Sequence, residues 1–167
     1  MIHAARIRVA RPQDARVMAA LHGECGLSGW GHEAISGYLR TRVGFGLLGW
    51  PYTVGRSSRS IETAVGFLLC RLLPGDEAEL LTVGVLGAAR SQGIGSAMLR
   101  VGLREASRKG ARQIFLEVAE DNDWARRMYE RHGFVTLGRR KDYYQRPSGG
   151  AATALVLGRP LAAVNRR

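Results

Sequence analysis

The N-terminal half of the chain alternates between short apolar segments and polar turns, which predicts strands and hairpins. Ile7–Ala10 alternates polar and apolar residues like a short strand. Residues 45–50 and 63–73 are apolar runs, and the stretch 55–60 between them consists of polar turn-forming residues. We therefore expect these two runs to form a hairpin.

Further strands are predicted in the second half. The turn Pro74-Gly75-Asp76 leads into a third strand of the meander at residues 78–85. Residues 113–118 are nearly all apolar, which is typical of a strand covered on both faces. The final predicted strands are residues 134–140 and 152–157, joined through the loop Pro147-Ser148-Gly149-Gly150.

Helical spacing of apolar residues appears between these strands. Pro12 lies at a first helical turn and opens a helix that reaches about His22. A glycine-rich loop precedes a second short helix, predicted over residues 32–40. Residues 94–109 predict a largely buried helix, which Gly110 ends.

The last predicted helix follows three N-cap candidates, Asp121, Asn122 and Asp123, and stops at Gly133. One side of this helix carries Trp124, Ala125, Met128, Tyr129 and His132. The resulting order, βα(α)βββαβαββ, predicts an α/β domain with a mixed, mostly antiparallel central sheet flanked by helices.

Composition adds a single-domain size and a strong positive charge. The chain has 167 residues and a formal net charge of +11 at pH 7. Of the 25 basic residues only Lys109 and Lys141 are lysines, so the charge is mainly guanidinium. This charge suits an anionic partner, which could be a phosphorylated cofactor, a nucleoprotein or any polyanion bound nonspecifically. The alternative is that the protein comes from an arginine-rich proteome and the charge has no specific partner. No motif for sequence-specific nucleic-acid binding accompanies it.

The remaining composition favours a reduced, soluble protein of the cytoplasm. Cys25 and Cys70 are too few for a disulfide scaffold and lie among apolar neighbours. The N-terminus carries no apolar signal segment, and no apolar run approaches the roughly 18 residues of a membrane span. Four scattered histidines have no metal-ligand spacing, so we predict no metal site.

A glycine-containing segment stands where a predicted strand gives way to a helix. It runs Arg90-Ser91-Gln92-Gly93-Ile94-Gly95-Ser96. Glycines let a backbone approach a ligand, and amides at a helix N-terminus attract phosphates. Neither a dinucleotide fingerprint nor a Walker loop fits, because Met98 replaces the third glycine of the first and Gly-Lys-Ser/Thr is missing from the second. A flexible strand-to-helix turn is the structural alternative.

Two further residues are candidates for proton transfer. Glu117 is the only charge within the apolar strand 114–118, which makes it a candidate general base. The alternative is a glutamate at the open end of a strand. Tyr129 lies seven residues, or two helical turns, after Asn122 on the apolar helix face. Its phenol could protonate a leaving thiolate, although a core tyrosine is the default interpretation.

Together these segments resemble the GNAT superfamily of acetyl-CoA-dependent N-acetyltransferases. Arg90-x-x-Gly93-x-Gly95 fits the superfamily's Gln/Arg-x-x-Gly-x-Gly/Ala loop. The resemblance covers residues 78–158 best and implies a single acetyltransferase domain over residues 1–167. It also implies that the loop amides cradle the pyrophosphate of coenzyme A and that the preceding strand pairs with the pantetheine arm. The cofactor contacts so implied are Val83, Gly84, Val85, Arg90, Ser91, Gln92, Gly93, Ile94, Gly95, Ser96 and Asn122.

Within the superfamily the chain looks most like the RimI type, the ribosomal-protein alanine N-acetyltransferases. The resemblance rests on Glu79-Leu-Leu-Thr-Val83, Phe115-Leu-Glu-Val118, Asn122 with Tyr129, and Gly138-Arg-Arg-Lys-Asp-Tyr-Tyr144. It implies that Glu117 accepts a proton, that Tyr129 donates one, and that Tyr143, Tyr144 and Trp30 contact the acceptor. Paired strand aromatics packing across a hairpin are the structural alternative for the two tyrosines.

The implied reaction is direct acetyl transfer to the N-terminal α-amine of a protein, with the N-terminal alanine of a small-subunit ribosomal protein as the expected acceptor. Two alternatives remain at this point. One is an acetyltransferase of a small-molecule amine, and the other is a non-catalytic acyl-CoA-binding module. A fold alone does not exclude the latter.

Overall fold

The computed structural model describes residues 5–52, 63–145 and 151–163. The elements in chain order are β1 (Ala5–Val9), the 3-10 turn η1 (Pro12–Asp14), α1 (Ala15–Glu24), α2 (His32–Arg40), β2 (Gly44–Pro51), β3 (Gly66–Leu73), β4 (Glu77–Val85), the 3-10 turn η2 (Gly87–Ala89), α3 (Ile94–Arg108), β5 (Gln113–Ala119), α4 (Asp123–Arg131), β6 (Val135–Gln145) and β7 (Ala151–Pro160). The predicted order of strands and helices is confirmed.

The strands form a seven-stranded sheet in the order β1-β2-β3-β4-β5-β7-β6. β4 and β5 are parallel, with Glu77–Leu80 in register with Gln113–Leu116. The pairs β1–β2, β2–β3, β5–β7 and β6–β7 are antiparallel. The α/β class and the mixed, mostly antiparallel sheet are therefore confirmed, and so is the hairpin expected of residues 45–50 and 63–73.

The chain folds as two compact units. Unit 1 consists of Met1–Arg71 and Thr82–Gly102, and unit 2 consists of Leu72–Leu81 and Leu103–Arg167. The boundary between the units crosses β4 and α3, so each unit contains one part of either element.

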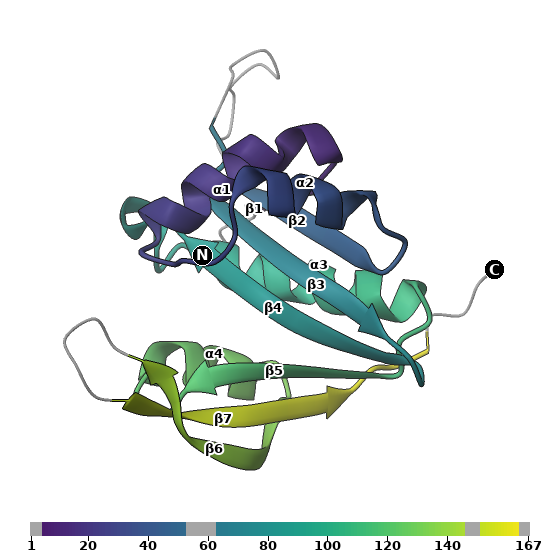
Figure 1. Ribbon diagram of the computed structural model, residues 1–167, viewed down its shortest axis with the longest axis vertical. Coiled ribbons are helices and arrows are strands. Elements are labelled where there is room, and N and C mark those ends of the chain that lie inside the picture. The colour runs from purple at the N-terminus through teal and green to yellow at the C-terminus, as the bar shows by residue number, and fades with distance from the viewer. Residues whose placement is uncertain (1–4, 53–62, 146–150, 164–167) are drawn as a thin grey trace. The chain divides into compact units, whose positions relative to one another are not determined.

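Unit 1 is a three-layer arrangement in which α1 and α2 cover one face of β2 and the first part of α3 covers the other (Figure 1). Glycines on β2 allow helices to pack closely against both of its faces. A Cβ at Gly46 would lie 2.9 Å from Met18 of α1, and a Cβ at Gly49, on the opposite face, would lie 2.9 Å from Met98 of α3. The residues of β2 are consequently buried from Gly44 to Trp50.

Unit 2 has a sheet with one buried and one half-exposed face. Ile114, Leu116 and Val118 of β5 are buried, whereas Phe115 and Glu117 between them are half-exposed. The expectation that β5 is covered on both faces is therefore wrong. The sequence does carry a signal of this, because Gln113 and Glu117 alternate with the buried residues, but the apolar Phe115 between them obscures it.

Local signals account for most helix boundaries. The helix predicted over residues 32–40 is confirmed as α2. The helix predicted from Pro12 begins as η1, whose Asp14 carboxylate accepts the Arg11 backbone N–H at 2.7 Å, before α1 continues it. Gly110 and Gly133 follow α3 and α4 with φ of 106° and 78°, the left-handed conformation that favours glycine after a helix.

Trp124 was expected on the apolar side of α4 and is instead 56% exposed, because the buried stripe of that helix begins at Ala125. The loop 147–150 and the turn 55–60 lie outside the described residues. Among the residues described, none of the helices combines the length and apolar character that crossing a bilayer requires.

Candidate functional site

The glycine-containing segment connects β4 to α3 within unit 1 through two residues of left-handed backbone. Ser91 has φ 61° and Gly93 has φ 77°. Because β-carbons disfavour this conformation, glycine fits the second position without strain and Ser91 holds the first at a small conformational cost. The left-handed conformations of these two residues turn the chain from the end of β4 into the first turn of α3.

The N-terminus of α3 has the chemistry of an anion site. The N–H of Ala97 bonds to the Gly93 carbonyl at 2.9 Å and starts the helical ladder. The first turn of a helix presents backbone N–H groups without intrahelical acceptors, and the helix dipole adds partial positive charge there. A pyrophosphate is an acceptor-rich anion, so the donor set of residues 92–96 fits the phosphates of coenzyme A.

Side chains bind this loop to the end of β4 and to η2. The Arg90 Nε donates to the Val85 carbonyl at 3.1 Å, and the Gln92 amide donates to the Ala88 carbonyl at 3.3 Å. These hydrogen bonds fix the backbone conformation of the loop independently of any ligand. Preorganised donors bind an anion with less ordering penalty than a loose loop would.

The second half of β4, which carries Val83, Gly84 and Val85, is packed closely from within unit 1. A Cβ at Gly84 would lie 2.5 Å from the Phe67 ring and 2.9 Å from the Cys25 Sγ. Glycine is therefore required here for close approach. Burial raises the pKa of the Cys25 thiol, although Arg90 opposes that shift, so the thiol is held in its protonated, less nucleophilic form.

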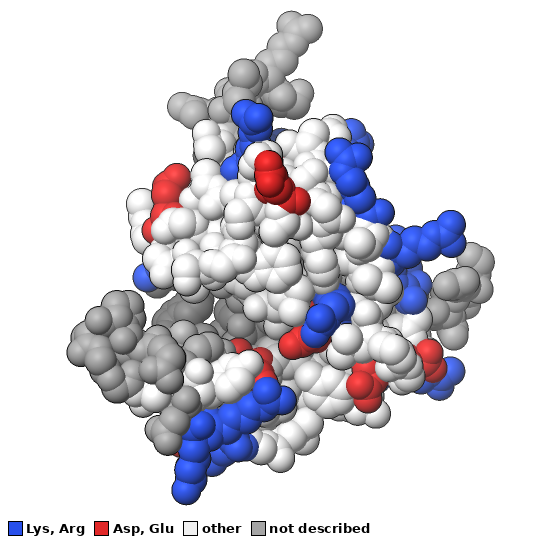
Figure 2. Space-filling view, viewed as in Figure 1, with Lys and Arg blue, Asp and Glu red and all other residues white. Residues whose placement is uncertain are grey.

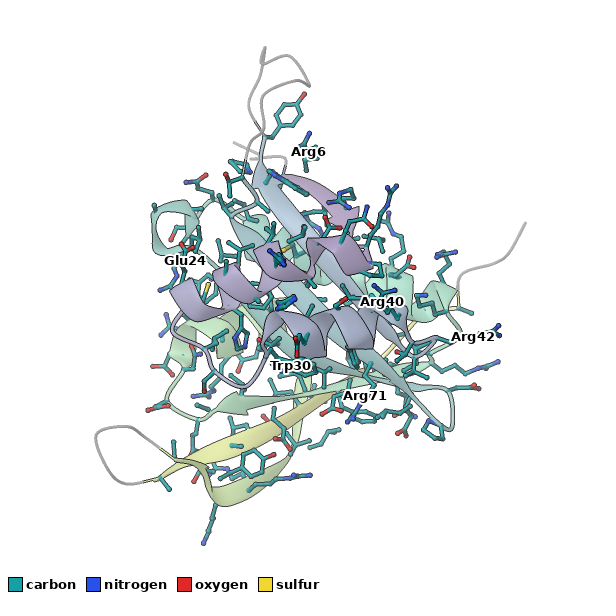
Figure 3. All side chains as sticks on the ribbon, turned by 45° about the horizontal axis from the view of Figure 1, so that its top comes forward. Arg6, Glu24, Trp30, Arg40, Arg42 and Arg71 are labelled. Carbon is teal, nitrogen blue, oxygen red and sulfur yellow. The ribbon has the colours of Figure 1, made fainter. Side chains whose placement is uncertain are left out.

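Trp30 also belongs to unit 1 and lies just before α2 (Figure 3). Its ring meets the Tyr38 ring edge-on at a centroid distance of 5.4 Å. The Tyr38 hydroxyl in turn donates to the Cys70 carbonyl of β3 at 2.9 Å. The indole is thus oriented by a tyrosine that is itself fixed to the sheet.

Glu117 lies on the half-exposed face of β5 in unit 2 and has a cationic partner. Its Oε1 is 3.0 Å from the Arg140 Nη1 of β6, with 21% of the Glu117 side chain exposed. The sequence had marked Glu117 as the only charge of an apolar strand. The structure adds a guanidinium that reaches it from two strands away.

Asn122 has a structural role at the start of α4. Its Oδ1 accepts the Ala125 N–H at 3.2 Å, the geometry of an N-cap. The N-cap expected among residues 121–123 is therefore Asn122. Its expected contact with the cofactor stays a prediction.

Tyr129 is held firmly inside unit 2. It is 5% exposed, and its ring meets the Phe134 ring edge-on at 5.6 Å. The Tyr129 carbonyl accepts the N–H of His132 at 2.9 Å and that of Phe134 at 3.1 Å, which closes the turn after α4. The ring position is thus set by the same turn that ends the helix.

Tyr143 and Tyr144 lie on β6 near an irregularity of its pairing with β7. The register passes from Arg140↔Ala154 to Tyr144↔Ala152, so β6 carries extra residues between these pairs. The Tyr143 side chain is 47% exposed. The side chain of Tyr144 lies outside the described part of the structure.

Basic side chains gather over β6, as Figure 2 shows at the bottom of the view. Arg139, Arg140 and Lys141 are exposed there. Arg139 pairs with Glu120 at 2.6 Å, whereas Arg140 pairs with Glu117. The sequence shows these basic residues but not their ion-pair partners, because the register that brings β6 near Glu117 is a property of the folded sheet.

The candidate residues fall into two groups. Unit 1 holds the strand and loop expected to bind the cofactor, together with Trp30. Unit 2 holds Glu117, Asn122, Tyr129 and the β6 tyrosines.

The chain is similar to many known proteins, among them the following two relatives and one solved structure. The chain is 37% identical over 93 residues to a [ribosomal protein bS18]-alanine N-acetyltransferase of Haemophilus influenzae, covering 56% of this chain and 62% of that protein. It is 42% identical over 78 residues to a mycothiol acetyltransferase of Frankia casuarinae, covering 46% of this chain and 23% of that protein. The chain thus spans less than two thirds of the length of either relative.

Among solved structures, the ribosomal-protein-S18-alanine N-acetyltransferase of Escherichia coli has the same fold, with a TM-score of 0.79 at 20% identity over 98% of each chain. Residues 39–134, more than half of the chain, match the acetyltransferase (GNAT) family. The match includes the glycine-containing segment 90–96, Glu117 and Tyr129. The chain belongs to the acetyltransferase (GNAT) family.

Proposed function

We propose that this protein is an acetyl-CoA-dependent N-acetyltransferase of the cytoplasm that acetylates the N-terminal α-amine of a protein, with an N-terminal alanine of a small-subunit ribosomal protein as the acceptor. The observation that carries the proposal is the match to the GNAT family across the loop, Glu117 and Tyr129. The names of the Haemophilus influenzae and Escherichia coli relatives support the choice of acceptor.

In this proposal the amides of residues 92–96 bind the coenzyme A pyrophosphate, with Arg90, Ser91 and Asn122 as further contacts. The fixed loop and the N-terminus of α3 support this role. Val83, Gly84 and Val85 bind the pantetheine arm through their backbone. Bound acetyl-CoA supplies an activated acetyl group as a thioester.

Glu117 and Tyr129 carry the proton transfers of a direct mechanism in a ternary complex. Glu117 accepts a proton from the acceptor's ammonium group, directly or through water, which frees the amine to attack the thioester carbonyl. Tyr129 then donates its phenolic proton to the departing sulfur, and the resulting phenolate takes up the proton that the attacking nitrogen loses as the amide forms, directly or through water. Positioned acids and bases of this kind each contribute about 10²- to 10⁴-fold to a rate.

The α-amine suits a half-exposed carboxylate as its base. A protein α-amine has a pKa of about 7.7–8.0, against about 10.4 for lysine, so much less driving force is needed to deprotonate it near neutral pH. Tyr143, Tyr144 and Trp30 are the proposed contacts with the acceptor peptide. Their aromatic faces suit a small apolar first residue such as alanine.

A thiol-release assay with acetyl-CoA tests the proposal. The acceptors are an alanine-starting peptide, its N-acetylated form, a peptide with a lysine side chain and a blocked N-terminus, and an aminoglycoside. We expect release with the free alanine terminus alone. We expect Glu117→Gln and Tyr129→Phe each to lower kcat by about 10²-fold or more. The control Glu130→Gln, on the exposed side of α4, retains full activity.

Other outcomes identify the competing functions. Release with the aminoglycoside but not with peptides would favour a small-molecule acceptor, a class for which the mycothiol acetyltransferase relative is a precedent within the family. Measurable binding of acetyl-CoA with no release on any acceptor would favour a non-catalytic acyl-CoA-binding module. Full turnover in both the Glu117→Gln and Tyr129→Phe variants would contradict the assigned roles.

A further inference from the structure

Arg140 and Glu117 face each other across an intervening strand. Glu117 is in register with Val156 of β7, and Arg140 is in register with Ala154 of the same strand. Val156 and Ala154 are two residues apart, and directly opposed residues share a face, so all four side chains lie on one face of unit 2. Ala154 is small and leaves a path for the long arginine side chain to cross β7. The result is the 3.0 Å contact between the guanidinium and the carboxylate.

The two partners of this ion pair differ in exposure. The Arg140 side chain is 57% exposed, against 21% for Glu117. Arg140 also has a second partner, because its guanidinium carbon lies 5.4 Å from the centroid of the Tyr143 ring. An exposed ion pair contributes little to stability, and an aromatic face is a favourable alternative neighbour for a guanidinium. The arginine is therefore the partner that can leave the carboxylate.

We propose that Arg140 is an internal competitor of the acceptor's ammonium group at Glu117. The inference rests on the proposed function, in which an amine reaches Glu117 in its protonated form. The Glu117 carboxylate then binds either of two cations, the Arg140 guanidinium or the acceptor's ammonium group, but not both at once. The acceptor's ammonium displaces the guanidinium, and Arg140 remains beside Tyr143. Arg140 thereby weakens the binding of the acceptor and raises its KM, without taking part in proton transfer.

Steady-state kinetics at saturating acetyl-CoA separate competition from orientation of Glu117. Removal of the competitor in Arg140→Ala lowers the KM for the alanine-starting peptide by about two- to fivefold, the range that an exposed ion pair allows, with kcat within twofold of wild type. Arg140→Lys keeps a cation and stays near the wild-type KM. The control Arg139→Ala, one residue away and paired with Glu120, leaves KM unchanged.

The opposite pattern overturns the proposal. If Arg140 serves to orient Glu117, Arg140→Ala lowers kcat and leaves KM unchanged or raised. An equal decrease of KM in Arg139→Ala would indicate a general effect of surface charge, which also overturns a specific competition at Glu117.

A titration followed by nuclear magnetic resonance tests displacement without turnover. In coenzyme-A-bound protein with ¹⁵N-labelled arginine, the Arg140 Nε–Hε signal is assigned from its loss in Arg140→Lys. The free alanine-starting peptide moves this signal toward its position in Glu117→Gln, whereas the N-acetylated peptide, which carries no terminal ammonium, leaves it in place. A signal unmoved by the free peptide, or moved equally by both peptides, overturns the inference. Lack of turnover with every acceptor in the thiol-release assay would instead contradict the proposed function.

Discussion

His22 on α1 is a titratable side chain inside the core of unit 1. It is 4% exposed, and its ring meets the Phe67 ring of β3 edge-on at 5.6 Å. Burial lowers its pKa, because a charged imidazolium would lose its hydration in this apolar setting. The folded protein therefore holds His22 in its neutral form more strongly than the unfolded chain does.

This residue makes the stability depend on pH in a defined range. Unfolded His22 binds a proton below its ordinary pKa of about 6.5, whereas folded His22 does so only at lower pH. The unfolded state then binds more protons, so the free energy of unfolding decreases as the pH falls from about 6.5 through the folded pKa. Urea unfolding at a series of pH values from 7.5 to 5 measures this decrease.

Replacement of the histidine isolates its contribution. His22→Leu places an apolar, non-titrating side chain in the core. Its free energy of unfolding should depend less on pH in this range than that of the wild type. His32→Leu, at an exposed position of α2, should keep the wild-type dependence. A wild-type slope that persists in His22→Leu would assign the effect to other groups.

At the scale of elements, α4 depends on the cap that Asn122 provides. Asn122→Ala removes the bond to the Ala125 N–H and should lower the free energy of unfolding by about 1 kcal/mol. Asn122→Asp keeps an acceptor at the same place and should retain most of the stability. Thermal or urea unfolding of the three proteins measures both changes.

The same pair of variants separates the cap from cofactor binding. If Asn122 also contacts the cofactor, Asn122→Asp should raise the KM for acetyl-CoA, since the new negative charge would repel an anionic ligand. An unchanged KM in Asn122→Asp, with reduced stability in Asn122→Ala, would leave the residue with a structural role alone.

β4 depends on the absence of a side chain at position 84. In Gly84→Ala the new methyl group would lie 2.5 Å from Phe67 and 2.9 Å from Cys25 Sγ, so neighbouring groups have to move. Such overpacking destabilises proteins by about 1–3 kcal/mol. Gly87→Ala, where a Cβ meets nothing within 4 Å, is the matched control and should be close to neutral. Equal stability of the two variants would contradict the tight packing of β4.

Most elements were predictable because their signals are local. α2 follows a glycine-rich loop and shows helical spacing, and the end of α3 is marked by Gly110. The two faces of β5 are marked only weakly in the sequence, since Gln113 and Glu117 alternate with buried residues but Phe115 between them is apolar. The exposure of Trp124 was missed because an apolar side chain does not show which turn of α4 starts the buried stripe.

The sequence names the residues of the candidate site, whose roles stay predictions, but it does not show the ion pairs around them. The loop before α3 has recognisable chemistry, and Glu117 stands out as a charge in an apolar strand. The partner of Glu117 lies on β6, and Arg140 reaches it only through the registers of β5 with β7 and of β7 with β6. Neighbouring Arg139 has the same local sequence signals and pairs elsewhere. Only the folded sheet distinguishes the two arginines.

At the scale of the whole molecule, the positive charge is distributed unequally between the units. In the full sequence, unit 1 has eleven arginines against four carboxylates, Asp14, Glu24, Glu33 and Glu62, whereas unit 2 has fourteen basic and ten acidic residues. Within unit 1, Asp14 is bound by Arg8 at 2.9 Å. An arginine-rich composition by itself would not produce this contrast, because both units have many basic residues and the number of acidic ones differs most.

The helices of unit 1 separate their charges further. Figure 3 shows Arg40 and Arg42 at one end of the α1–α2 pair and Glu24 at the other. Glu33 lies in the first turn of α2 and Arg40 in its last. A multivalent anion near Arg40 and Arg42 therefore meets guanidinium groups with no carboxylate of these two helices close by, whereas Arg127 and Arg131 of α4 flank Glu130 in the sequence.

Two double variants with the same change of net charge test this distribution. A fluorescently labelled single-stranded oligonucleotide serves as a generic polyanion, and its affinity is measured against salt concentration. Each phosphate contact contributes about 0.7 to the slope of log affinity against log salt. Arg40→Gln/Arg42→Gln should therefore reduce this slope by up to about 1.4. Arg127→Gln/Arg131→Gln should reduce it less, because neighbouring carboxylates weaken the local potential. Equal reductions would mean that net charge alone, and not its placement on unit 1, attracts anions to the protein.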